Sequence, residues 1–155
     1  MRLVIEGESA LYKKLFNLTD VMKRSFWIGV QEDFEGNLLK NIKPHSKTGK
    51  LERNAYVDII NGGVEGGVRD NGMMVTTKGQ KVNYGVFVEF GTKPHIITPS
   101  KKKSLRFFIG SKAVFSKSVK HPGYKGDPFL MNAAKETFGN LERIFNTELK
   151  DKGIV

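Results

Sequence analysis

Apolar residues recur at steps of three and four along the first forty positions, which is the spacing of one face of an α-helix. They are Leu11, Leu15, Leu18, Met22, Phe26, Val30, Phe34 and Leu38. The pattern predicts a long helix over residues 9–41, with a break near residues 17–20, where a Thr-Asp pair is a second capping sequence. Pro44 disfavours helical geometry at the preceding residue, so the helix must end at or before Lys43. A loop and one helical turn are expected next, within residues 44–56.

The following segment has the signals of a β-sheet. Residues 56–72, "YVDIINGGVEGGVRDNG", alternate β-branched and polar residues around Asn-Gly and Gly-Gly pairs, which supply the positive φ angles of tight hairpins. The glycine-rich "GGVEGGV" is therefore interpreted as hairpin turns, because it lacks the residues of a phosphate-binding loop. Residues 73–90 continue the sheet, with Phe87 and Glu89 on one face of a strand. A short helix at that place is the alternative that the sequence leaves open.

Two further elements are predicted toward the end of the chain. "SLRFFIG" and "AVFSKSV" predict a hairpin closed at "IGSK". A closing helix follows, with Asp127 as its N-cap and Pro128 at its first position. Its apolar stripe is Leu130, Ala134, Phe138, Leu141, Phe145 and Leu149.

These elements predict an α+β fold: a long N-terminal helix and a C-terminal helix packed on a mostly antiparallel β-sheet with extended hairpins. The chain has 155 residues, of which 39% are hydrophobic, which fits a single domain over residues 1–155. It contains no cysteine, which excludes a disulfide framework, a cysteine-ligated zinc site and a thiol nucleophile. The apolar run before Glu6 is too short for a signal peptide or a membrane span, so we expect a soluble intracellular product.

The formal net charge of +10 is concentrated in one window. Between Phe90 and Gly126 there are nine basic residues and no acidic one, whereas the rest of the chain has 17 basic and 16 acidic residues. The nine are Lys93, Lys101, Lys102, Lys103, Arg106, Lys112, Lys117, Lys120 and Lys125. Such a window attracts phosphate, an acidic membrane surface or an acidic protein face. An ordinary solvated loop is the alternative, although surfaces normally intersperse both signs of charge.

The sequence offers only fragments of catalytic or metal-binding constellations. Ser100 and Lys103 form an S-x-x-K and residues 47–49 form a K-T-G, but the order is reversed and the third motif of penicillin-binding enzymes is missing. No helix is expected to carry two histidines at ligand spacing, and each histidine adjoins a proline: His45, His95 and His121. We therefore expect no enzyme, no cofactor and no metal site.

Glu89 is the one acid in the apolar run "VFVEF". A catalytic base is one interpretation, because an isolated carboxylate among apolar residues is a common feature of active sites. We favour a structural acid, held by hydrogen bonds of the adjoining turn or by a cation such as Lys93. Glu89, Gly91, Pro94 and His95 are then predicted to form a structural turn that directs the basic hairpin outward.

Several stretches together resemble a known family. The start, "LVIEGESALYKKLFNL", resembles the strand, glycine and leucine-rich helix that open the neck and tail-completion morphogenesis proteins of long-tailed bacteriophages. "KTGKLERNAYV" is similar to that family's T-G-x-L-R-x-S segment, and "YGVFVEFGTKPH" to its Y-A-x-x-V-E-x-G-T signature. "HPGYKGDPFLMNAA" resembles its closing H-P-G and P-F-L. The chain departs from these patterns at Asn54, Gly85 and the rich lysine run, so the resemblance does not identify the partner.

The resemblance implies a structural virion protein, made in the bacterial cytoplasm and located at the head-tail junction. It implies a ring of identical subunits, hexamer-like, that joins or completes the tail. Its partners would be a head-closure or connector protein and the tail tube or tail terminator, without a membrane. The basic hairpin is expected to face an acidic protein or the passing DNA through Lys101, Lys102, Lys103, Arg106, Lys112, Lys117 and Lys120. The alternative function is a stand-alone nucleic-acid-binding protein that uses the same hairpin, residues 93–125.

Overall fold

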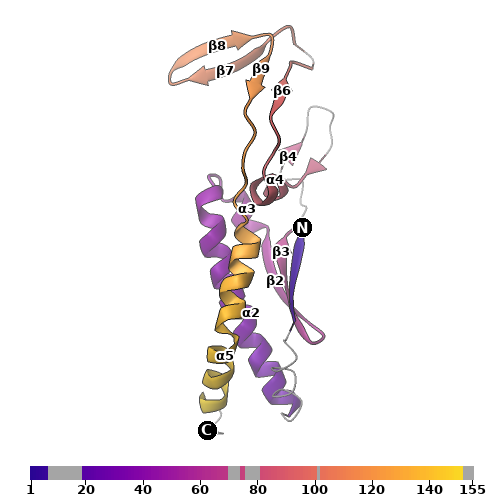
Figure 1. The fold of residues 1–155 in the computed structure, drawn as a ribbon, viewed down its shortest axis with the longest axis vertical. Helices are drawn as coiled ribbons and strands as arrows, with labels where there is room; N and C mark the ends of the chain where they lie inside the picture. Colours follow the sequence, from indigo (N-terminus) through magenta and orange to yellow (C-terminus); the bar gives the residue numbers. More distant parts are fainter. Residues whose placement is uncertain (7–18, 70–73, 76–80, 101, 152–155) are drawn as a thin grey trace.

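The computed structural model describes residues 1–6, 19–69, 74–75, 81–100 and 102–151. It shows an elongated body from which a long arm projects (Figure 1). In the body, two antiparallel helices, α2 (Asp20–Ile42) and α5 (Phe129–Asp151), pack on a three-stranded antiparallel sheet. The sheet has the order β1-β3-β2, from β1 (Arg2–Glu6), β2 (Ala55–Ile60) and β3 (Gly63–Val68). The fold is α+β, as the sequence predicts.

The remaining elements are short and lie at or beyond the upper end of the body in Figure 1. They are η1 (Lys43–His45), α3 (Lys50–Arg53), β4 (Met74–Val75), β5 (Lys81–Val82), α4 (Tyr84–Phe90), β6 (His95–Ile97), β7 (Leu105–Ile109), β8 (Lys112–Ser116) and β9 (Val119–His121). The strands pair antiparallel as β4-β5, β6-β9 and β7-β8. The expected hairpin closed at "IGSK" is confirmed by β7 and β8.

Helix α2 begins and ends where the local sequence predicts. The Thr19 hydroxyl accepts a hydrogen bond from the Met22 N–H at 3.4 Å, and the helix ends at Ile42, two residues before Pro44. The predicted stripe is confirmed over this part of the helix, because Phe26, Val30, Phe34 and Leu38 are all buried in the core. The part of the long N-terminal helix expected over residues 9–18 lies outside the described residues.

The glycine-rich segment differs from its prediction. Only the Asn61-Gly62 pair is a turn, with Gly62 at φ 81°, while residues 63–68 form β3, the central strand of the sheet. Gly66 faces α2 there, and a Cβ at this position would overlap the ring of the fully buried Phe34. The glycine therefore serves close packing between sheet and helix, which a residue with a side chain could not provide.

Residues 84–90 form helix α4, so the predicted strand is wrong and the helical alternative is confirmed. The Asn83 side chain accepts from the Gly85 N–H at 2.9 Å and caps the helix, which ends before Gly91 at φ 75°. Gly85 and Glu89 are the buried residues of α4, and their spacing of four places them on one helical face. In the sequence, the alternation of valine and phenylalanine favours a strand, which obscured the helix-terminal signals of Asn83 and Gly91.

Helix α5 packs along α2. Its residues Leu130, Ala134, Leu141 and Phe145 are buried as expected. Phe138, predicted on the same stripe, is instead 43% exposed, because it lies toward β1 at the side of the body. The side chain of Leu149 lies outside the described residues.

Candidate assembly site: a basic arm and its root

The arm, residues 91–126, leaves the body after α4 and returns to it before α5 (Figure 1). Its root is fixed by Glu89, whose side chain is buried. One carboxylate oxygen accepts from the Leu130 N–H at 2.9 Å and the other from the Met131 N–H at 3.1 Å. These donors belong to the first turn of α5, where backbone N–H groups have no partner within the helix. Glu89 therefore caps α5 from a position 41 residues earlier in the chain.

The two sides of the root are also joined through the backbone. The Asp127 N–H donates to the Val88 carbonyl at 2.7 Å, and Thr92 and Tyr124 exchange two hydrogen bonds of 2.7 and 2.9 Å. Gly91 has a φ of 75°, and a Cβ at this position would collide with the Tyr124 carbonyl oxygen. The chain can cross here only with a glycine.

The structural turn expected at residues 89–95 is therefore larger than the sequence indicated. Glu89 is held by hydrogen bonds, but they come from α5 rather than from its own turn, and no cation pairs with it among the described residues. Asp127, predicted as the N-cap of α5, instead places Oδ2 at 3.1 Å from His45 Nε2. Gly91 lies in the root itself, while Pro94 follows the root and His95 begins β6.

Above the root, β6 and β9 form a two-stranded stalk. His95 and His121 are cross-strand partners whose rings stack at 4.9 Å. His95 Nδ1 donates to the Lys93 carbonyl at 2.8 Å, because a carbonyl only accepts, and His121 Nδ1 accepts from the Gly123 N–H at 3.1 Å. All three residues of β6 are exposed, including Ile96, which is 64% exposed.

The tip of the arm is the ribbon formed by β7 and β8. Arg106 and Phe108 lie on the same face of β7, and Phe115 is the direct partner of Arg106 on β8. The Arg106 guanidinium carbon lies 5.2 Å from the ring centre of Phe108 and 6.0 Å from that of Phe115. Both rings are more than 60% exposed. We call Arg106, Phe108 and Phe115 the tip face.

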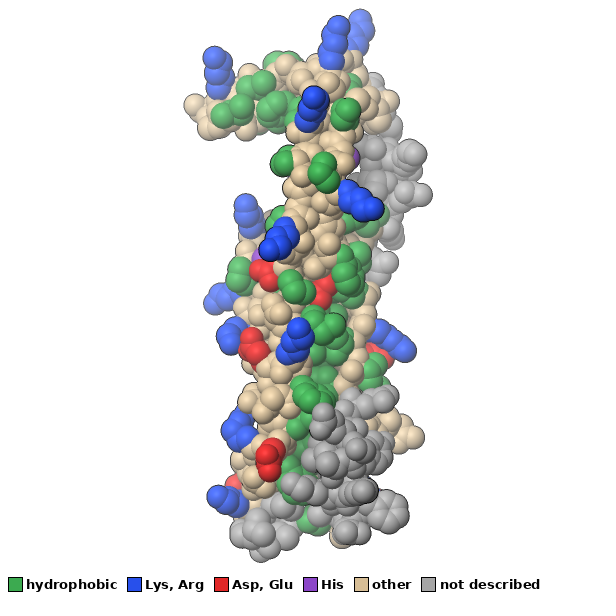
Figure 2. Space-filling model, viewed as in Figure 1, with side chains coloured by type: hydrophobic (Ala, Val, Ile, Leu, Met, Phe, Trp, Pro, Cys, Tyr) green, Lys and Arg blue, Asp and Glu red, His purple; other side chains and the backbone are tan. Residues whose placement is uncertain are grey.

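The basic side chains of the arm are distributed along its length, with hydrophobic side chains between them (Figure 2). All eight that the structure describes are exposed, and none has an ion-pair partner in that part of the chain. They are Lys93, Lys102, Lys103, Arg106, Lys112, Lys117, Lys120 and Lys125. Lys101 lies outside the described residues. The geometry is therefore a cationic strip and not a single cluster.

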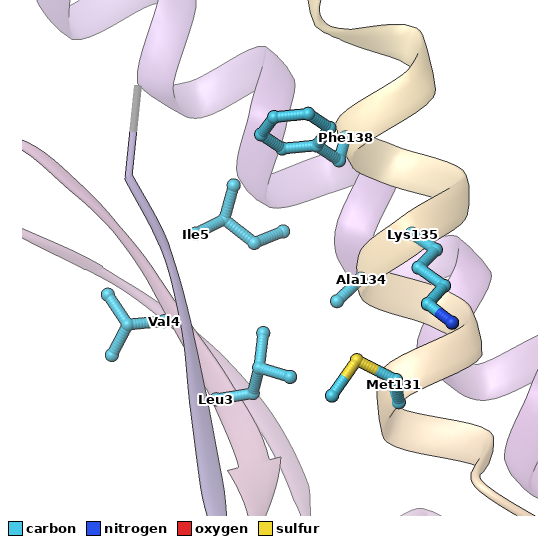
Figure 3. Close-up of a pocket in the computed structure, with 7 residues that line it drawn as sticks. All are labelled: Leu3, Val4, Ile5, Met131, Ala134, Lys135 and Phe138. Atoms are coloured by element: carbon cyan, nitrogen blue, oxygen red, sulfur yellow. The ribbon is translucent and has the colours of Figure 1, made fainter. Parts of the chain in front are cut away.

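The body offers an apolar groove of about 390 Å³ between β1 and α5 (Figure 3). Leu3 and Ile5 point across it toward Met131 and Phe138. Among the described residues that line the groove, Lys135 alone is charged. The described lining residues do not include a set of converging polar groups of the kind that substrate sites normally have.

No group of three potential metal ligands occurs among the described residues. The helices that the structure describes include none that is long and apolar enough to cross a bilayer.

Sequence reasoning placed the basic residues on an extended element but missed the tip face. The spacing of Phe107, Phe108 and Phe115 suits a buried strand equally well, so exposure had to come from the structure. It also missed the capping of α5 by Glu89, since residues 41 positions apart give no local signal.

Comparison with protein-family models, with curated proteins and with solved structures finds no match for the chain.

Proposed function

We propose that the protein is a structural component of a phage virion, which assembles as a ring at the head-tail junction and joins or completes the tail. The observation that carries this proposal is the arm, a projecting pair of two-stranded ribbons that buries little of its own apolar surface. An isolated two-stranded ribbon is marginally stable at best in water. An arm of this kind gains stability when it lies against another molecule.

The stalk supplies a surface for a neighbouring protein subunit. Ile96 of β6 is 64% exposed, and below the stalk Phe90 at the end of α4 and Tyr124 in the root are 72% and 43% exposed. Large exposed apolar side chains that group together often mark protein interaction sites. A contact between the stalk of one subunit and the body of the next is heterologous, and such contacts close into rings when the rotation allows it.

Three of the segments that resemble phage neck proteins meet at the root. "YGVFVEFGTKPH" contains Glu89, and "HPGYKGDPFLMNAA" contains the Leu130 and Met131 N–H groups that Glu89 binds. In "KTGKLERNAYV", the side chain of Leu51 lies against Gly85, so closely that a Cβ there would approach it to 3.0 Å. The segments that resemble phage neck proteins thus contact one another, which supports the proposal that the arm of this chain has the same root as in those proteins.

Ring assembly can be tested with a substitution in the stalk. We expect Ile96→Asp to remove self-association, because it places a charge in the contact, while Ile96→Val keeps the surface apolar and preserves it. Native mass spectrometry and light scattering measure the oligomer directly, and circular dichroism checks that each variant is folded. Equal oligomers from both variants would contradict a contact through the stalk.

The role at the junction is tested in the phage or prophage that encodes the chain. Reversing the charges of Lys101, Lys102 and Lys103 to glutamate should leave unjoined heads and tails in lysates viewed by electron microscopy. Lys150→Glu, an exposed lysine at the end of α5, is the matched control and should give normal particles. Normal infectious virions from the triple variant would refute the proposed use of the arm.

The alternative is a stand-alone nucleic-acid-binding protein, which the basic charge and the exposed aromatic rings of the tip face favour. It predicts DNA binding by an isolated monomer that weakens steeply with salt. A gel-shift experiment at two salt concentrations, on protein of known oligomeric state, separates it from ring assembly.

A further inference from the structure

The tip of the arm has a composition that indicates the chemistry of its ligand. It combines exposed aromatic rings with exposed lysines and an arginine, and it has no acidic residue. Protein-protein interfaces are depleted in lysine, whereas interfaces with nucleic acid are far more positively charged. A second arm is excluded as the partner, because two strips that carry only positive charge repel each other.

The geometry of the ribbon fits a groove of double-stranded DNA. β7 and β8 have five residues each and are joined by the two-residue turn Gly110-Ser111. At about 3.3 Å per residue the ribbon is roughly 17 Å long. The major groove, about 12 Å wide, admits a two-stranded β-ribbon, and apolar wedges such as Phe are used against base steps in the minor groove.

The tip face is arranged so that one side of the ribbon can meet bases. Arg106 lies between Phe108 and Phe115 on this side, whereas Phe107 and Val114 on the opposite side are half-buried. The aromatic rings are therefore presented outward together with a planar cation. In a groove, the guanidinium can donate hydrogen bonds to base edges, and the rings can contact thymine methyl groups or act as wedges at base steps.

Lysines flank this face on both approaches. Lys102 and Lys103 precede β7 and Lys117 follows β8, while Lys112, the partner of Ile109, lies on the opposite side of the ribbon with Val114. All four are exposed and unpaired among the described residues, and the three that flank the tip face are available to phosphates on either side of a groove.

We propose that the tip of the arm binds double-stranded DNA, with Arg106, Phe108 and Phe115 toward the bases and the flanking lysines on the phosphates. This inference deepens the proposed function, since it names the ligand that the arm contacts at a junction through which DNA passes. It rests on that function only for its biological setting, because binding is a property of the purified chain.

The decisive measurement is the dependence of affinity on salt, made by fluorescence anisotropy with a labelled duplex of about 30 base pairs, or roughly three helical turns, which is several times the length of the ribbon. Phe108→Ala combined with Phe115→Ala should lower the affinity about fivefold or more with an unchanged salt slope, because apolar contacts with the bases do not release counterions. Lys102→Ala combined with Lys103→Ala should instead reduce the slope by about 0.9 for each phosphate that the variant no longer neutralises. Phe138→Ala and Lys150→Ala on the body are the matched controls and should change neither quantity.

Three results would overturn the proposal. They are an unaltered affinity in the double phenylalanine variant, tighter binding of a single strand of the same length, and binding to vesicles of phosphatidylserine and phosphatidylcholine without binding to duplex. Native mass spectrometry of the same variants distinguishes a failure of DNA binding by the tip from a failure of ring assembly. Rings that form without DNA binding would remove this inference and leave the proposed function, while DNA binding by a permanent monomer would do the reverse.

Discussion

Substitution of Glu89 should weaken the whole fold, because this carboxylate joins the root of the arm to helix α5. Its two oxygens accept from the Leu130 and Met131 N–H groups at 2.9 and 3.1 Å, and its side chain is buried. A hydrogen bond to a charged group contributes about 1.5–3 kcal/mol, and loss of an N-terminal cap costs about 0.5–2 kcal/mol. Because water can reach the part-buried Met131 N–H, we expect Glu89→Ala to lower the free energy of unfolding by about 2–4 kcal/mol.

The conservative variant separates charge and hydrogen bonding from packing. Glu89→Gln keeps the shape of the side chain but turns an amide donor toward one of the two N–H donors. We expect it to lose about 1–2 kcal/mol, roughly half the effect of alanine. Glu35→Ala, an exposed acid of α2, is the matched control and should change stability by less than about 0.5 kcal/mol.

Urea denaturation followed by circular dichroism measures these differences, and hydrogen exchange locates them. The amides of Leu130 and Met131 should lose protection in both Glu89 variants, since their acceptor is removed or altered. If Glu89→Ala were as stable as Glu35→Ala, the carboxylate would not cap α5 in solution and the assigned role would be wrong.

Two further predictions concern packing and pH. Gly66→Ala should destabilise the fold by about 1–3 kcal/mol in urea unfolding, because the new methyl group overlaps the ring of Phe34. Gly36→Ala on α2 is the control, because its methyl group meets nothing within 4 Å and should stabilise the fold by about 0.5–1 kcal/mol. Equal effects of the two substitutions would contradict the close packing at Gly66. The Lys40 ammonium, at 2.9 Å, lowers the pKa of the Glu136 carboxyl, so Glu136 stabilises the fold above its ordinary range near 4.5 and this contribution disappears as the pH falls through the lowered pKa. Glu136→Gln should therefore cost about 0.2–1 kcal/mol at about pH 7, as for an exposed pair, and nothing at about pH 2, and a loss that is the same at both pH values would refute the ion pair as its cause.

The sequence predicts the main helices and the fold class well because their signals are local. The Thr19 cap, the stop before Pro44 and the periodic apolar positions all act within a few residues of one another. The central strand β3 was mistaken for turns because glycine has two uses, positive φ angles and close approach, and the sequence alone does not distinguish them. At Gly66 the deciding neighbour is Phe34, which lies on α2, far away in the sequence.

The difference between local signals and contacts distant in the sequence also explains how much of the candidate site could be predicted. Charge is additive along the chain, so the basic window was visible without a structure. Exposure is not additive, since it depends on whether another layer covers a strand. Phe108 and Phe115 have the spacing of core residues and became surface residues only because nothing in the described chain covers that face of the ribbon.

The close approach of the chain at the root has a consequence for how such a protein can change over evolution. A Cβ on Gly126 would lie 2.6 Å from the Gly91 backbone nitrogen, so the two ends of the arm are effectively adjacent. A segment whose ends touch can be lengthened, shortened or exchanged with only a small change in the entropy of closing it. The arm is in this sense an insertion carried by a body that keeps its own core. Its length and charge can adapt to a new partner while α2, α5 and the sheet keep their structure.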